Sequence, residues 1–102
     1  MYCIICERKI IADKEFNPFK DDHNTTFFKE GVVGKLEANY GSSHDGDIFM
    51  IALCDNCISE KLKSNTLLYK GNYMLGDDIV KDNIDKSIKG YTRRINIDKL
   101  IN

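Results

Sequence analysis

The sequence lacks any apolar run of about eighteen residues, the length that a transmembrane helix needs, so we expect no membrane association. Its net charge is close to zero, because the 15 Lys and Arg residues are balanced by 16 Asp and Glu residues. A nearly neutral protein is not expected to bind nucleic acid over its whole surface, since such binding depends on neutralising phosphates. Internal repeats and low-complexity segments are absent as well. The 102 residues are therefore expected to form one small domain with at most an appendage.

Features of a secretory signal are also missing. The sequence starts with Met1, Tyr2 and Cys3, with no basic segment, apolar segment or small-residue cleavage site around them. We therefore expect a cytoplasmic protein, in a compartment where paired cysteines are more often metal ligands than disulfides. A chain of this length buries only a modest core, so a bound metal ion is an expected source of stability.

Cysteine occurs only as two Cys-x-x-Cys pairs, which leave no odd thiol. Two intervening residues allow a tight turn to point both sulfurs at one metal ion, so each pair supplies half of a tetrahedron. Thiolates are soft ligands, and four of them select zinc or an iron–sulfur cluster over hard cations. The pattern predicts one structural Zn²⁺ ion held by Cys3, Cys6, Cys54 and Cys57.

Other uses of these cysteines remain open at this point. Disulfides would need an oxidising compartment. Thioredoxin-like chemistry would need a strand before the redox pair, and Cys3 lies too near the start for one. The same thiolates could hold an iron–sulfur cluster, although its common spacings place three cysteines close together. A catalytic zinc ion keeps one ligand position open, whereas four matched cysteines indicate a closed, structural site.

The residues between the two pairs predict a β-hairpin that leads into a helix. From residue 25 to residue 40 the pattern is strand-like, and it ends in period-two alternation. Residues 41–47 are rich in Gly, Ser and Asp and predict a loop. The apolar run Ile48–Leu53 has the length of a strand. A helix is then expected with Cys57 in its first turn, where the helix dipole favours a thiolate.

A first knuckle, a β-hairpin and a helix that carries the second ligand pair resemble the treble-clef class of zinc domains, with zinc ribbons as the neighbouring possibility. The residues from Asn39 to Asp47, followed by Leu53–Cys57, are also similar to a pattern in small, uncharacterised bacterial and phage zinc proteins. The resemblance covers about the first two-thirds of the chain and implies a zinc-stabilised fold, without a function. Because Cys6 and Cys54 are far apart in sequence, it also implies an insertion or an elaborated hairpin.

The remainder of the chain is expected to be a helical and β appendage. Residues 67–75 predict a small hairpin or an exposed apolar segment. A helix is expected over residues 77–89, with an apolar stripe at four-residue spacing, and Gly90 is expected to end it. Residues 94–97 alternate and predict a final short strand. The fold class is thus α+β, with a zinc-binding domain over residues 1–75 and a C-terminal segment over residues 76–102 that packs on it or contacts a partner.

No catalytic constellation is apparent, and we expect no enzyme. Residues 42–45 contain a hydroxyl, an imidazole and a carboxylate, but neighbours in sequence rarely form a triad, which is assembled across a fold. The glycines at both ends of this loop favour a turn in which the polar side chains bond nearby backbone. The functional alternative is that Ser43, His44 and Asp45 contact a partner.

A basic cluster near the C-terminus is the other candidate contact: Lys86, Lys89, Arg93, Arg94 and Lys99. It either forms a solvated helix face or contacts phosphate or an acidic partner, with Arg93 and Arg94 as the candidate binding residues. The sequence favours a non-catalytic zinc-stabilised protein–protein interaction module, a small regulatory or adaptor protein of bacterial or phage type. Its expected partner is another protein or a second copy of the chain. The alternative is a nucleic-acid-binding zinc protein that uses the basic C-terminal segment.

Overall fold

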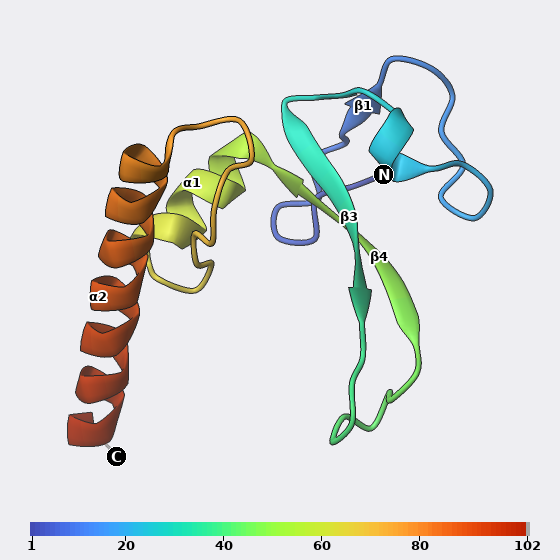
Figure 1. Ribbon diagram of the computed structural model, residues 1–102. Coiled ribbons are helices and arrows are strands. Elements are labelled where there is room, and N and C mark those ends of the chain that lie inside the picture. The colour runs from blue at the N-terminus through green and yellow to red at the C-terminus, as the bar shows by residue number, and fades with distance from the viewer. Residues whose placement is uncertain (102) are drawn as a thin grey trace. The chain divides into compact units, whose positions relative to one another are not determined.

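The computed structural model describes residues 1–101, and their side chains as far as residue 97. This part of the chain is a small α+β protein with two antiparallel two-stranded sheets and two α-helices (Figure 1). It divides into two compact units, one from Met1 to Cys57 and one that begins at Ile58. The predicted division into a zinc-binding domain over residues 1–75 and a C-terminal segment over residues 76–102 stays a prediction.

The expected hairpin is the main feature of the first unit. β3 (Gly31–Glu37) pairs antiparallel with β4 (Ile48–Cys54), in a register that runs from Gly31 opposite Cys54 to Glu37 opposite Ile48. Beyond the strands, the Ala38 amide donates to the Asp47 carbonyl at 2.9 Å and continues the ladder. The connecting loop turns through Gly41 and Gly46, whose φ angles of 102° and 88° suit glycine.

A second, smaller sheet precedes this hairpin. β1 (Ile11–Ala12) pairs antiparallel with β2 (Phe28–Lys29), and the ring of Phe28 packs edge-on against Phe16 at 5.0 Å. The strand-like pattern expected from residue 25 was wrong at its start, where the 3₁₀-helix η1 (His23–Thr25) forms. The Asp22 side chain accepts from the Asn24 amide at 2.9 Å and caps this turn, an interaction that period-two patterning does not reveal.

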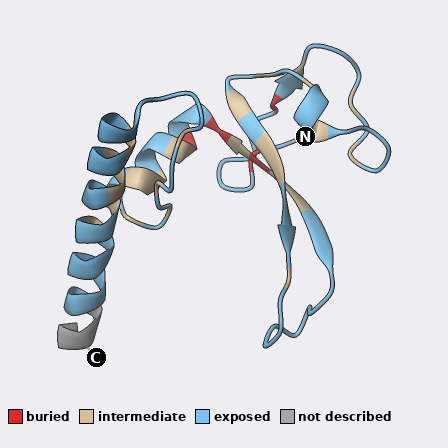
Figure 2. Cartoon of the chain, in the orientation of Figure 1, coloured by how far each residue is buried: buried red, intermediate tan, exposed pale blue. Residues whose placement is uncertain are grey.

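The core of the first unit is centred on the cluster of cysteines. Figure 2 shows its few buried residues: Cys3, Ile10, Ala52, Cys54 and Cys57. Around them pack the half-buried side chains of Met1, Phe28, Val33 and Leu53. A Cβ on Gly31 would come within 2.8 Å of both the Ile10 side chain and the Leu53 carbonyl oxygen, so this position of β3 requires glycine. Such a core is too small to stabilise a fold without a staple.

Helix α1 (Asp55–Lys63) begins in the first unit and ends in the second. The end is a Schellman motif, in which Asn65 is left-handed (φ 61°). The Asn65 amide donates to the Leu62 carbonyl at 3.3 Å, and the Thr66 amide donates to the Lys61 carbonyl at 3.1 Å. Two of the orphan carbonyls of the last turn, those of Lys61 and Leu62, are thereby satisfied.

Helix α2 (Asp77–Ile101) corrects two predictions. Gly90 lies inside it and does not end it, and residues 94–97 are helical and not a strand. A glycine within a helix costs only about 1 kcal/mol, which tertiary contacts can offset. An alternation over four residues is too short to separate a strand from a helix.

The connection between the helices contains no hairpin. Of the two predictions for residues 67–75, the exposed apolar segment is correct for its second half, with Tyr73 96% exposed and Met74 74% exposed. In its first half, Leu67 and Tyr69 are half-buried. The Tyr69 amide donates to the Ser87 hydroxyl at 2.9 Å and joins this connection to α2. The expected apolar stripe of α2 is half-buried at Val80 and Ile84 and exposed at Ile88.

Candidate metal centre

The first Cys-x-x-Cys pair forms a closed turn. The Cys3 amide donates to the Arg8 carbonyl at 2.8 Å, and the Glu7 amide donates back to the Cys3 carbonyl at 2.9 Å. Tyr2 and Lys9 form a single antiparallel bridge just outside this turn. To close it, Glu7 adopts a left-handed conformation with a φ of 64°, which costs a residue with a side chain about 1–2 kcal/mol.

The hairpin and α1 present the second pair. Cys54 is the last residue of β4, and Cys57 is the third residue of α1, as the sequence predicted. The turn of the first pair lies against the outer edge of β4, where the Ile4 amide donates to the Ala52 carbonyl at 2.9 Å. This contact fixes the two pairs relative to each other through the backbone.

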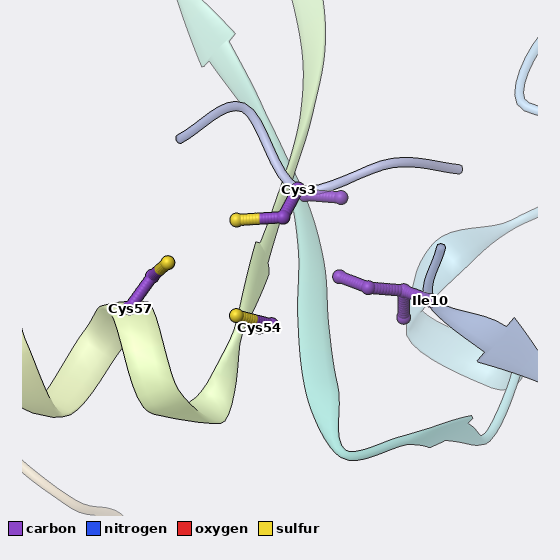
Figure 3. Packing of buried hydrophobic residues seen from close by; sticks show 5 residues of the cluster. Cys3, Ile10, Cys54 and Cys57 are labelled. Carbon is purple, nitrogen blue, oxygen red and sulfur yellow. The ribbon is translucent and has the colours of Figure 1, made fainter. Parts of the chain in front are cut away.

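The four sulfur atoms converge. All of them lie within 4.8 Å of one another, and the sulfurs of Cys6 and Cys54 are 3.6 Å apart. At a zinc–sulfur distance of about 2.3 Å, the sulfurs of a tetrahedral site would lie about 3.8 Å apart. Figure 3 shows the sulfurs of Cys3, Cys54 and Cys57 pointing toward a common space. The donor set therefore fits a structural metal ion.

The cysteines differ in exposure and in acidity. All four are free thiols, of which Cys6 is exposed and the other three are buried. Backbone amides of Cys6, Cys54 and Ile5 donate to the Cys3 sulfur and lower its pKa from 9.0 to about 6. Hydrogen bonding to Cys54, burial and the nearby Cys3 charge raise the pKa of Cys57 from 9.0 to about 12. In the metal-free cluster, protons therefore remain on some of the thiols, and a metal ion would displace these protons when it binds.

The loop residues proposed to contact a partner are all exposed. Within the loop, the His44 amide donates to the Ser42 hydroxyl at 3.0 Å, and the imidazole lies 3.5 Å from the Asp47 carboxylate. The His44 ring also packs edge-on against Phe49 at 5.7 Å. Ser43 and Asp45 take part in none of these side-chain contacts. The loop is thus held by short-range turn bonds, as the sequence suggested, and does not assemble a triad.

The two arginines proposed as binding residues have different environments. Arg94 donates to the Ser64 carbonyl at 3.0 Å, so it binds the end of α1. Arg93 lines an open groove of about 420 Å³ together with Lys63 and Arg94. Among residues 1–97, whose side chains the structure describes, no acidic residue lines this groove. The sequence does not reveal this contact of Arg94, because its partner is a backbone atom thirty positions away.

Comparisons of the chain with protein-family models, with curated proteins and with solved structures find no match. Among the residues that the structure describes, no helix combines the length and the apolar character needed to cross a membrane.

Proposed function

We propose that this protein is a non-catalytic, zinc-stabilised protein–protein interaction module, a small regulatory or adaptor protein of bacterial or phage type. Its zinc ion would be held by Cys3, Cys6, Cys54 and Cys57 in a treble-clef-like arrangement, and an ion with four thiolate ligands supplies structure. The four ligands leave no open position for a substrate, which supports a structural role.

The observation that carries the proposal is an apolar face on the hairpin. The register places three cross-strand pairs on one face, where every side chain is apolar and Gly34 adds none: Val32 with Leu53, Gly34 with Ile51, and Leu36 with Phe49. Val32 is 50% exposed, Leu36 is 54% exposed and Phe49 is 45% exposed. Contiguous exposed apolar surface of this kind is typical of a binding site.

The opposite face of the same hairpin has a different character. Near the cysteines it is apolar and buried, at Ala52, or half-buried, at Val33. Toward the loop it carries an exposed ion pair between Lys35 and Glu37, at 3.2 Å. One face of the hairpin therefore supplies Val33 and Ala52 to the core around the cysteines. The other face contributes only Leu53 to that core, and its Val32, Leu36 and Phe49 are exposed to a partner.

The two faces provide a matched experiment. We would immobilise the zinc-loaded protein, a variant with Leu36→Thr and Phe49→Thr, and a control with Lys35→Thr and Glu37→Thr. Threonine retains strand propensity, so both pairs of substitutions keep the hairpin. A protein retained from a bacterial lysate by the wild type and the control, but not by the apolar-face variant, would support the proposal. Equal retention by all three proteins would contradict it.

Nucleic-acid binding is the second candidate, and the groove lined by Lys63, Arg93 and Arg94 favours it. The cations also lie beside the C-terminal end of α1, whose dipole they complement, so a structural role explains part of the arrangement. Fluorescence anisotropy with labelled single-stranded DNA and RNA at low salt would test it. Binding that weakens steeply with salt and is lost on Arg93→Ala would favour this function, and absence of binding would dismiss it.

A further inference from the structure

The outer edge of β4 has backbone groups without partners. In an antiparallel pair, the N–H and C=O groups of alternate residues point toward the neighbouring strand and away from it. The Ala52 carbonyl accepts a hydrogen bond from the Ile4 amide on the side of β4 away from β3. Ile48 and Met50 lie four and two residues before Ala52, so their N–H and C=O groups also point away from β3. The bonds of Asp55 to Glu30 and of Ala38 to Asp47 agree with this phase.

The metal-site turn covers only one end of this edge. The Ile4 amide donates to the Ala52 carbonyl, and the Cys54 amide donates to the Cys3 sulfur. The N–H and C=O groups of Ile48 and Met50 have no hydrogen-bond partner among residues 1–101. Figure 1 shows this distal part of the hairpin extending beyond the other segments of its unit. The open stretch is therefore short and is centred on Phe49.

The side chains along this edge include none of the residue types that prevent pairing with another strand. The run Ile48–Leu53 contains no charge, proline or glycine. Natural proteins usually protect an open edge with a charge, a proline or a bulge, because an unprotected edge adds another strand. The outer edge of β3 differs, because it carries the charged pair of Lys35 and Glu37 and lies near η1.

We propose that β4 pairs with β4 of a second copy of this chain, antiparallel, about a two-fold axis at Phe49. Ile48 then lies opposite the partner's Met50, and Met50 lies opposite the partner's Ile48. Every open backbone donor and acceptor of this stretch is used, which no other register of the same two edges achieves. The result is a four-stranded sheet in the order β3-β4-β4-β3.

Two features favour a second copy as the occupant. The open stretch is symmetric about Phe49, so a two-fold axis satisfies both copies at once and closes the assembly. The two Phe49 side chains lie directly opposite each other on the apolar face, where aromatic cross-strand pairs are favourable, and no like charges meet. The pairing uses the edge of the hairpin and leaves its apolar face open. It needs only this chain, so it stands or falls independently of the proposed function.

The test uses two proline variants at the same level of the hairpin. Lys35 and Met50 are register partners, and the amides of both point away from the hairpin, on opposite edges. Met50→Pro removes a donor that only the second copy would use, and Lys35→Pro makes the same change on the β3 edge. Proline is tolerated at such outward positions of edge strands. Each zinc-loaded full-length protein would be studied by sedimentation velocity over a range of concentrations, with elemental analysis of its zinc content.

We expect wild type and Lys35→Pro to form dimers of the 11.7 kDa chain. Met50→Pro should bind zinc but dimerise at least roughly tenfold more weakly, because each copy loses an intermolecular hydrogen bond and gains a steric conflict. A monomeric wild type, unimpaired dimerisation of Met50→Pro, or equal weakening of both variants would overturn the proposal. Loss of dimerisation in Lys35→Pro alone would instead assign the contact to the β3 edge.

Amide hydrogen exchange of the wild-type protein gives a second measurement, which remains valid if Met50→Pro fails to fold. The amides of Phe49 and Ile51 face β3 and should be protected at every concentration. The amides of Ile48 and Met50 should be protected in concentrated solution and lose that protection on dilution. Fast exchange of Ile48 and Met50 at high concentration would overturn the proposal.

Discussion

The side chain of Asn65 occupies the space beside Gly90 that any other residue at position 90 would need. A Cβ on Gly90 would come within 2.7 Å of the Asn65 Cγ atom and closer still to its Oδ1 atom. Asn65 is the left-handed residue that ends α1, and Gly90 lies in the middle of α2. The glycine that the sequence suggested as a helix stop is therefore the point where the end of one helix contacts the other.

This contact predicts an unusual response to Gly90→Ala. In an exposed helix, replacing glycine by alanine stabilises by about 1 kcal/mol. Here the new methyl group must displace the Asn65 side chain, so we expect the gain to be lost or reversed. In the background of Asn65→Gly, which keeps the left-handed conformation and removes the side chain, Gly90→Ala should recover the gain. Urea unfolding of the four proteins measures this coupling, and additive effects would contradict it.

Glu7 provides a prediction about the first Cys-x-x-Cys turn. Its φ of 64° is strained for a residue with a side chain, and its side chain is exposed. Glu7→Gly should therefore stabilise the zinc-loaded protein by about 0.5–1 kcal/mol. Lys9→Gly is the matched control, because Lys9 lies in an extended bridge where glycine should destabilise by a similar amount. Thermal unfolding would show the two changes with opposite signs, and a destabilising Glu7→Gly would contradict the expected strain.

Removal of the metal should unfold the first unit. Three of its five buried residues are cysteines, so little apolar core remains when the ligands are released. We expect a strong chelator to abolish the dispersion of amide signals from residues 1–57, and stoichiometric zinc to restore it. Cys57→Ser should have the same effect at any zinc concentration used for the wild type. A dispersed, metal-free spectrum would contradict a structural role, and a coloured, iron-containing protein would identify a cluster in place of zinc.

Metal affinity should fall as the pH is lowered. The lowered pKa of Cys3 favours its thiolate in the folded arrangement of the four cysteines. This contribution to stability is complete above pH 9.0 and is lost as the pH falls through about 6. The raised pKa of Cys57 favours its thiol, and that contribution is complete below pH 9.0 and lost as the pH rises through about 12. Zinc must therefore displace a proton from Cys57 at neutral pH. Chelator competition should show affinity decreasing from about pH 8 to about pH 6, and a flat profile would contradict this account.

The loop at the end of the hairpin should matter little for stability. His44 and Asp45 are exposed, and the contacts of His44 are short-range. His44→Ala and Asp45→Ala should each change the free energy of unfolding by no more than about 0.5 kcal/mol. Gly46→Ala, at a φ of 88°, should destabilise by about 1 kcal/mol and serves as the control. A large loss of stability in either polar variant would show that the loop is structural and not available for a partner.

The sequence by itself determined the parts of this protein that depend on near neighbours. The spacing within each Cys-x-x-Cys pair, the turn residues of the loop and the start of α1 before Cys57 are local properties, and each predicted its element correctly. The meeting of the two pairs was also predictable, because a hairpin returns the chain to its starting point and four thiols have few other uses in so small a core.

Only the tertiary structure decided the features that depend on distant residues. Position 90 of α2 needs glycine because Asn65 fills the space beside it, and Arg94 in the same helix binds the Ser64 carbonyl. The open edge at Ile48 and Met50 depends on where the turn containing Ile4 stops covering β4. Composition and periodicity report the preference of each residue for burial and backbone conformation, whereas contacts between distant segments decide which groups are left without partners.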